Sequence, residues 1–172
     1  MELYDGLLTR RSARIYDRGR RASDADIEKI LKAAMHAPSA HGRFPWEFVV
    51  IRSGGMLDAA AAAHPYAKFV PEAGTAIVVC GDLVRQHKNG DAQYWHIDCS
   101  AATQNILLAA HSLGLASCWC GIYPVESRME DFKNLLSLPE HIAPFSIVAL
   151  GYAAKGQTQP QNRFDESKIH FC

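Results

Sequence analysis

The chain has 172 residues, of which 48% are hydrophobic and 21% are charged. This composition is typical of one globular domain that folds without disulfides or a structural metal. Eighteen basic residues balance eighteen acidic ones, so net charge favours neither nucleic acid nor an anionic membrane as a partner. No apolar run is long enough to span a bilayer, and the N-terminus does not resemble a secretory signal, so we expect a cytoplasmic protein.

The first predicted elements are a short helix over residues 3–9, an arginine-rich loop, and a second helix that begins after Ser23. Ser23 is a favourable N-cap, and Asp26 lies three residues later, where a capping box places an acidic residue. Pro38 limits the helix at its other end. Apolar side chains of this segment recur on one helical face: Ile27, Ile30, Leu31, Ala34 and Met35.

The remaining elements alternate between strands and helices. Four segments have the composition of strands, at residues 47–51, 75–80, 115–120 and 145–150. The run at 75–80 is almost entirely apolar and is therefore expected at the centre of a sheet. Helices are predicted at about 59–63, after a Gly54-Gly55 turn, and at about 93–113 and 125–136. The order predicts a single α+β domain with three layers, α/β/α, over residues 1–172.

Two segments suggest burial against a partner. From Ala101 onward the long helix is apolar on nearly all sides, which places it in a core or an interface. Residues 153–172 form a polar C-terminal arm, which is either disordered or lies on another surface. No G-x-G-x-x-G follows a strand, so a Rossmann dinucleotide site is not predicted.

The five cysteines do not form a recognisable metal or disulfide pattern. Their number is odd and no C-x-x-C is present, so the first four are expected to be reduced packing residues and Cys172 exposed. Cys118 and Cys120 form a C-x-C without a second half-site. The eight histidines also lack the spacing of a metal site, and no metal is predicted.

The strongest chemical signal is a cluster of six arginines with a single acid in the twelve residues from Arg10 to Arg21. Taken alone, this segment is either a solvated basic loop or a phosphate site. Arginine pairs bidentately with phosphate oxygens, and two or three arginines can neutralise a phosphomonoester. Ser12 adds a hydroxyl donor.

Two further segments are candidates for contact with a flat ligand. Residues 37–46 contain two prolines, small side chains and Gly42, which allows a close approach of the backbone. The alternative is a structured turn with Trp46 as a core anchor. Residues 114–122 end in a strand and Gly121, whose backbone N–H could point at a ligand.

Together these segments resemble the FMN-dependent nitroreductases in their short form. The matching motifs occur in the family's order between about residues 5 and 170: Arg10-Arg-Ser-x-Arg14, Ala37-Pro-Ser-Ala40 with Pro45-Trp46, the run from Asp98 to Ala110, Gly114-Leu115, Trp119-x-Gly121, Leu138-Pro-Glu140, Leu150-Gly-Tyr152 and Asn162-Arg-Phe-Asp165. The resemblance implies a mixed, mainly antiparallel sheet of four to five strands flanked by helices. It also implies a homodimer, with FMN at the interface and an extended C-terminal arm over about 153–172.

The resemblance assigns cofactor contacts to particular residues. One group reaches the phosphate, the ribityl chain and the pyrimidine edge of the flavin: Arg10, Arg11, Ser12 and Arg14. A second group lies along the isoalloxazine: Pro38, Ser39 and Ala40. The third is the strand end whose backbone N–H approaches flavin N5, namely Gly121 with its neighbours Cys120 and Ile122, and the tail arginine Arg163 returns to the phosphate.

Three positions depart from the family pattern. Gly42 and Phe44 stand where Asn and Gln are usual, which predicts a more apolar pocket on that side of the cofactor. Gln161 stands where some relatives carry a lysine, which removes one positive charge near the phosphate. These changes bear on substrate choice more than on FMN binding.

The resemblance implies an enzyme that passes electrons in a ping-pong cycle from NADPH or NADH through FMN to nitroaromatics, quinones or related organic acceptors. No side-chain acid or base is required, so no catalytic residue is assigned. Two alternatives remain open at this point: a dedicated flavin dehydrogenase on the same scaffold, and a non-enzymatic FMN-binding or redox-sensing protein.

Overall fold

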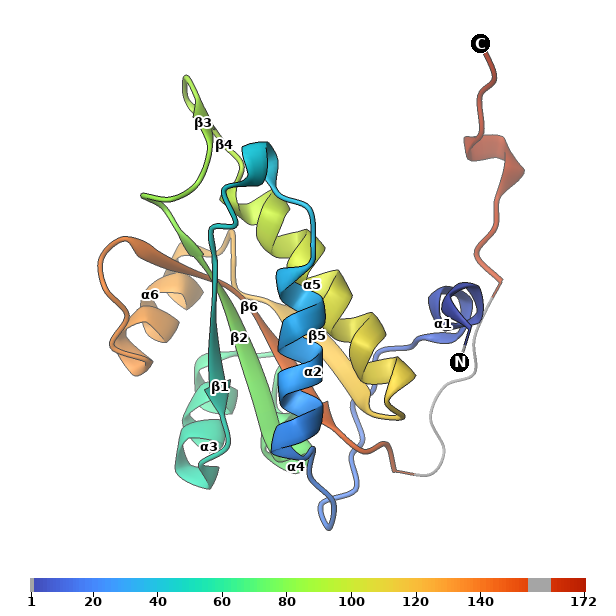
Figure 1. Cartoon of the computed structure of the whole chain (residues 1–172). Coiled ribbons are helices and arrows are strands. Elements are labelled where there is room, and N and C mark those ends of the chain that lie inside the picture. The colour runs from blue at the N-terminus through green and yellow to red at the C-terminus, as the bar shows by residue number, and fades with distance from the viewer. Residues whose placement is uncertain (1, 155–161) are drawn as a thin grey trace.

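The computed structural model describes residues 2–154 and 162–172 and shows three layers, with helices on both faces of a central sheet (Figure 1). The helices are α1 (Leu3–Thr9), α2 (Asp24–Met35), α3 (Gly54–Ala63), α4 (Val70–Ala73), α5 (Trp95–Ser112) and α6 (Glu126–Leu135). The strands of the sheet are β1 (Trp46–Ile51), β2 (Thr75–Asp82), β5 (Ala116–Gly121) and β6 (Ile142–Gly151). Smaller elements are a β3–β4 ribbon (Lys88–Asn89 and Ala92–Gln93) and the 3-10 turns Ala40–Gly42 and Glu166–Lys168.

The sheet has the strand order β1-β2-β6-β5, and every pair among these named strands is antiparallel. β2 and β6 occupy the centre; every residue of β6 is buried, and so is all of β2 except Asp82. Pro144 lies inside β6 because the register shifts there, so that Val79 faces Ser146 while Cys80 faces Pro144. The predicted central position of residues 75–80 and the three-layer α+β class are confirmed.

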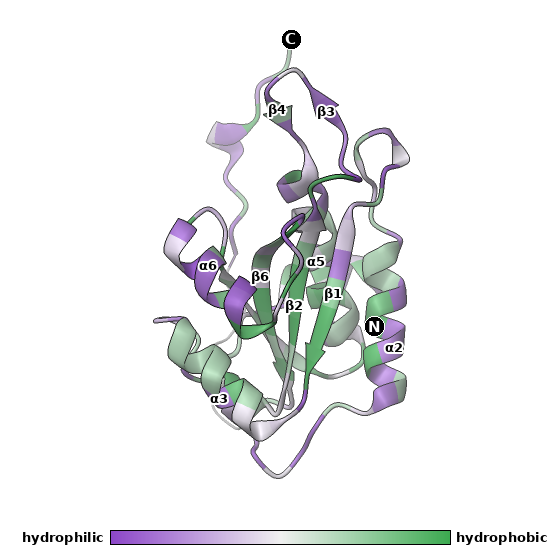
Figure 2. Cartoon of the chain, turned by 90° about the vertical axis from the view of Figure 1, so that its left-hand side faces the viewer, coloured by the Kyte–Doolittle hydropathy of each residue, from purple (hydrophilic) through white to green (hydrophobic). Residues whose placement is uncertain are grey.

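Each face of the sheet has its own helical layer. α2 and α5 cover one face, whereas α3, α4 and α6 lie on the other (Figure 1). Figure 2 shows the hydrophobic strands between these layers and the hydrophilic outer sides of α2 and α6. The sheet therefore separates two clusters of buried side chains. One includes Ile106 of α5, and the other includes Phe132 of α6.

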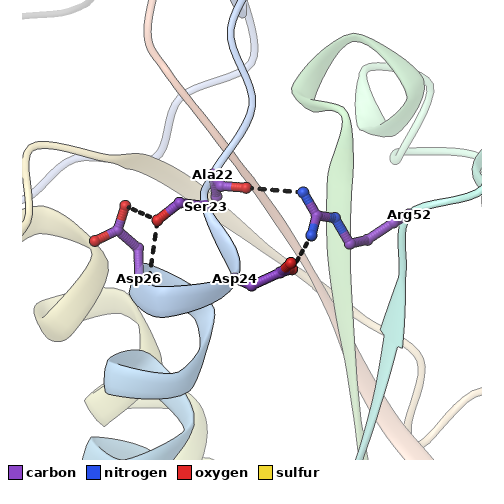
Figure 3. Close-up of polar contacts among 5 residues, drawn as sticks. All are labelled: Ala22, Ser23, Asp24, Asp26 and Arg52. Carbon is purple, nitrogen blue, oxygen red and sulfur yellow. Dashed lines mark hydrogen bonds and ion pairs between the residues drawn. The ribbon is translucent and has the colours of Figure 1, made fainter.

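The start of α2 is held by the cap that the sequence predicts (Figure 3). The Asp26 N–H donates to Ser23 Oγ at 3.1 Å, and the Ser23 hydroxyl donates to Asp26 Oδ2 at 2.7 Å. Arg52, which follows β1, donates to the Ala22 carbonyl at 3.0 Å and pairs with Asp24. Through these two contacts, Arg52 links the start of α2 to the edge strand β1.

Several boundaries differ from the predictions. Gly54 and Gly55 are the first residues of α3 and do not form a separate turn before it. The long helix begins at Trp95 because Gln93 pairs in the β3–β4 ribbon. That ribbon and the four-residue α4 were not predicted, since elements so short show no hydrophobic period.

Within residues 2–154 and 162–172, no helix is both long and apolar enough to cross a bilayer, and no cluster of three potential metal-ligating side chains occurs. All five cysteines are free thiols. Cys80, Cys99, Cys118 and Cys120 are buried and Cys172 is exposed, as expected. The Gln161 position lies outside the described residues.

We predict that Ser23→Ala lowers the free energy of unfolding by about 1 kcal/mol, because it removes the cap acceptor of the Asp26 N–H. Urea denaturation measures this change. Ser53→Ala is the matched control, since Ser53 precedes α3 but makes no capping hydrogen bond. Equal losses in the two variants would contradict the assigned cap.

Candidate functional site

The segment that carries the first arginines runs along the free edge of β5. The Ala13 N–H donates to the Ser117 carbonyl at 3.0 Å, and Ser12 forms an isolated parallel bridge with Ser117. This pairing covers an edge that would otherwise expose unpaired backbone groups. It also fixes the direction in which the arginines on either side of Ala13 leave the backbone.

The structure divides the arginine cluster into two groups. The later arginines serve the fold: Arg18 pairs with Glu72, Arg20 stacks 3.6 Å over the Tyr152 ring, and Arg21 lies against Gly74. Gly74 has a φ of 76°, and a Cβ there would meet the Arg21 side chain at 2.9 Å. Arg10, Arg11 and Arg14 instead line cavities.

Arg10 lies at the centre of a basic cavity. Its Nη1 is buried and has no hydrogen-bond partner among the described residues. Burial lowers the pKa of Arg10, and the nearby charges of Arg163 and Arg11 lower it further. A cavity of about 550 Å³ between α1 and the tail is lined by all three of these arginines. A buried donor without an acceptor, beside two like charges, would be stabilised by an anion.

His111 is a part of this region that the sequence did not reveal. It lies in the last turn of α5, and its Nε2 is 2.9 Å from Thr9 Oγ1. With Arg10 and Arg11 it lines a second cavity, of about 320 Å³. Burial, and then the charge of Arg10, lowers the pKa of His111. Both effects favour the neutral imidazole over the charged one beside the guanidinium groups.

The predicted ring-contact segment lies at the opposite end of α5. The Ala40 N–H donates to Asp98 Oδ1 at 2.9 Å, and the Phe44 N–H donates to Ser39 Oγ at 2.9 Å. Left-handed backbone occurs at His41, Gly42 and Phe44, with φ values of 52°, 62° and 49°. Non-glycine residues adopt this conformation only where surrounding contacts hold them. The loop after Pro38 is thus a fixed structure, with Phe44 partly exposed on it.

The two groups of predicted residues do not meet within one chain. Asp98, which holds Ala40, and His111, which contacts Thr9, are thirteen residues apart on α5. At 1.5 Å per residue this places them about 20 Å apart along the helix axis. A single chain therefore presents two half-sites, one basic and one formed by the loop after Pro38.

A third cavity lies at the end of β5. It has a volume of about 350 Å³ and is lined by Arg14, His64, Cys120 and Gly121, among others. A Cβ on Gly121 would have only the Tyr123 carbonyl oxygen nearby, at 3.6 Å, so space for a ligand is open there. Ile122 is fully buried, so its side chain belongs to the core.

Comparison with known proteins identifies the same family along most of the chain. The sequence profile of the nitroreductase family matches residues 7–68 and 56–152. A protein of Archaeoglobus fulgidus named "Putative NADH dehydrogenase/NAD(P)H nitroreductase" is 48% identical over 166 residues, which cover 95% of this chain and 94% of the relative.

Solved structures show the same fold. A protein of Bacteroides thetaiotaomicron with the same name has a TM-score of 0.91 and 43% identity, covering 98% of this chain and 96% of its own. A "putative nitroreductase in complex with fmn" from Desulfovibrio desulfuricans has a TM-score of 0.83 and 28% identity, covering 100% of this chain and 98% of its own. The latter was solved with the cofactor that the sequence motifs imply.

Asp98 provides a test of the α5 contact. Asp98 is only 3% exposed. Burial raises the pKa of its carboxyl, and the hydrogen bond from the Ala40 N–H lowers that pKa by a smaller amount. Because the pKa of Asp98 is higher in the folded state than in the unfolded state, its protonated carboxyl stabilises the fold. This contribution is complete below the unfolded-state pKa of about 3.9 and is lost as pH rises through the folded-state pKa.

We therefore predict that Asp98→Asn, which keeps a carbonyl acceptor for Ala40, gains stability relative to wild type between pH 4 and 7. Denaturation at several pH values measures this difference. Asp98→Ala is the control, because it loses the hydrogen bond and should be destabilised by about 1 kcal/mol. A difference between Asn and Asp that does not change with pH would refute the role of the buried charge.

Proposed function

The chain belongs to the nitroreductase family, and from this premise we propose that it is an FMN-dependent oxidoreductase. In this proposal it passes electrons from NADPH or NADH to nitroaromatics, quinones or related organic acceptors in a ping-pong cycle. The observation that carries the proposal is the buried Nη1 of Arg10, which lacks a hydrogen-bond partner among the described residues; Arg10 also shares a cavity with Arg163.

The basic half-site fits the phosphate of FMN. Arg10 offers an unused donor, and Arg11 and Arg163 line the same cavity. Three positive charges on neighbouring side chains repel one another, so a group of −1.5 to −2 charges relieves that repulsion. The name of a related protein supports the same cofactor, since one relative is an "FMN reductase (NADPH)" from Bacillus subtilis.

The loop half-site fits the flat ring, and a second copy of the chain would join the two halves. Ala40 is held at Asp98, near the start of α5, whereas Thr9, next to Arg10, contacts His111 near its end. In this proposal, the length of helix between them keeps the two regions of one chain from sharing a flavin. A two-fold axis brings the loop of each protomer to the arginines of its partner and makes two identical sites. We therefore propose a homodimer with FMN at the subunit interface.

The chain's own residues bind and orient the cofactor in this proposal. FMN supplies the redox chemistry, as cofactors of this kind do. Arg14 stabilises negative charge at the pyrimidine edge, and the open backbone at Gly121 admits the ring close to the end of β5. Gly42 and Phe44 leave the loop side apolar, because Phe44 packs on Trp46 with ring centroids 5.6 Å apart. No side chain is assigned as a catalytic acid or base.

The first test of the proposed function is spectroscopic. We expect the purified protein to be yellow and to lose its flavin absorbance when NADPH or NADH is added without air. Addition of a quinone should restore the colour. Double-reciprocal plots of the steady-state rate, measured at several quinone concentrations, should give the parallel lines of a ping-pong cycle. A yellow protein that stays oxidised would indicate a binding or sensing protein, and a protein that cannot be loaded with FMN would refute the cofactor.

The phosphate assignment has a separate test. We predict that Arg10→Gln weakens FMN binding about 10- to 100-fold, because hydrogen bonds to charged groups contribute roughly 1.5–3 kcal/mol. Fluorescence titration measures the dissociation constant. Riboflavin, which lacks the phosphate, should bind the variant and the wild type equally.

Arg18→Gln is the matched control on the protein, since Arg18 pairs with Glu72 away from the cavity. Its affinity for FMN should remain at the wild-type value. Equal losses for FMN and riboflavin in Arg10→Gln would show that Arg10 supports the fold and does not bind the phosphate.

A further inference from the structure

His64 is a buried histidine to which the proposed function gives no role. It directly follows the last turn of α3 and is only 1% exposed. Its Nε2 lies 2.9 Å from the Gly121 carbonyl oxygen at the end of β5, and its Nδ1 lies 3.2 Å from the Tyr66 nitrogen. The ring also packs edge-on against Phe132 of α6, with centroids 6.4 Å apart. These contacts connect a helical layer to the strand end beside which the flavin ring is proposed to lie.

The two contacts of the imidazole determine where its proton lies. A backbone N–H can only donate, so Nδ1 accepts the hydrogen bond from Tyr66. A carbonyl oxygen can only accept, so Nε2 carries the proton and donates to Gly121. A charged ring would also have a proton on Nδ1, and this proton would face the Tyr66 N–H. Burial lowers the pKa of His64 and favours the same neutral ring, although the hydrogen bond to Gly121 raises that pKa by a smaller amount.

A second donor reaches the same carbonyl oxygen. Arg128 of α6 donates from Nη1 to the Gly121 carbonyl at 3.3 Å, and its guanidinium lies over the Tyr66 ring, 5.4 Å from the centroid. A carbonyl oxygen has two lone pairs, so both hydrogen bonds can form together. Glycine has no Cβ to limit its backbone rotation, and the two donors therefore hold Gly121 in one orientation.

The backbone of β5 places the Gly121 N–H on the same edge as the Gly121 carbonyl. In an antiparallel strand, the N–H and C=O of one residue point to the same side, and successive residues alternate between the two sides. The Ser117 carbonyl points away from β6, because it accepts from Ala13. Gly121 is four residues further along and has the same orientation, whereas the Ile122 N–H donates to Phe145 of β6. The Gly121 N–H therefore points to the free edge of β5, and Gly121 lines the cavity at the end of this strand.

We propose that His64 is a positioning residue for the flavin: it holds the Gly121 carbonyl and thereby directs the Gly121 N–H toward the ring. This inference rests on the proposed function, which admits the ring close to the end of β5. His64 acts through the glycine, and its neutral form with the proton on Nε2 is the one that satisfies both of its hydrogen bonds. Loss of the donor lets the Gly121 peptide rotate, which weakens the contact with the ring and leaves the phosphate contacts unchanged.

Two substitutions separate this role from support of the local turn. His64→Gln places a side-chain N–H near the position of Nε2 and keeps a donor for Gly121, whereas the shorter His64→Asn keeps only an acceptor near Nδ1 for Tyr66. We expect His64→Asn to weaken binding of FMN and of riboflavin equally, by about 2- to 10-fold, as the loss of one neutral hydrogen bond does. His64→Gln should bind both as wild type does. Fluorescence titration measures the affinities, and the midpoint potential of bound FMN should shift in His64→Asn only.

Lys68→Met is the control for support of the same segment, since Lys68 Nζ donates to the Ala61 carbonyl of α3 at 2.8 Å. It should bind both flavins with wild-type affinity. In the protein without FMN, ¹⁵N NMR should find the His64 proton on Nε2. Equal losses in His64→Gln and His64→Asn, a loss for FMN alone, or a proton on Nδ1 would overturn this inference while the proposed function stands. Wild-type protein that binds neither flavin would refute the proposed function and this inference with it.

Discussion

Helix α5 is the constraint on which the candidate site depends. It contacts strands of the sheet and lies against α2, and its two ends carry different contacts. Asp98 near its start holds the loop at Ala40, and His111 near its end holds Thr9 beside Arg10. Because a helix cannot shorten, about 20 Å of helix separates the ring-contact loop from the basic cavity. In the proposed dimer, a second protomer supplies one of these two regions to each flavin.

Burial in the core, one of the two positions that its sequence allows, explains much of the apolar character of α5. Ile106, Leu107 and Ala110 are buried within the chain itself, against the sheet and α2, so much of the helix needs no partner. Large apolar side chains are exposed elsewhere, on α1 and on the tail: Leu3, Tyr4, Leu7, Leu8, Phe164, Ile169 and Phe171. The tail extends away from the body of the molecule (Figure 1). Exposed apolar surface of this kind indicates an interaction site and supports the proposed dimer through its arms.

Local patterns allowed the sequence to predict the elements that carry them. The period of α2, its cap at Ser23 and the apolar run of β2 were all visible, because each depends on neighbours a few residues away. The division of the arginines into two groups was not visible in the sequence. Arg18 pairs with Glu72 and Arg20 stacks on Tyr152, and both partners are distant in sequence. His111 gave no signal either. A single histidine on a helix acquires its role only from the segment that packs on it.

The pairing of residues 12 and 13 with β5 also sets the positions of the arginines in the cofactor proposal. Ala13 is buried where its N–H meets Ser117, so the residues that alternate with it leave the backbone on the other side. Arg10 lines the basic cavity beside the tail, and Arg14 lines the cavity at the end of β5. The same short stretch of chain therefore places one arginine at each of the two cavities that the cofactor proposal uses.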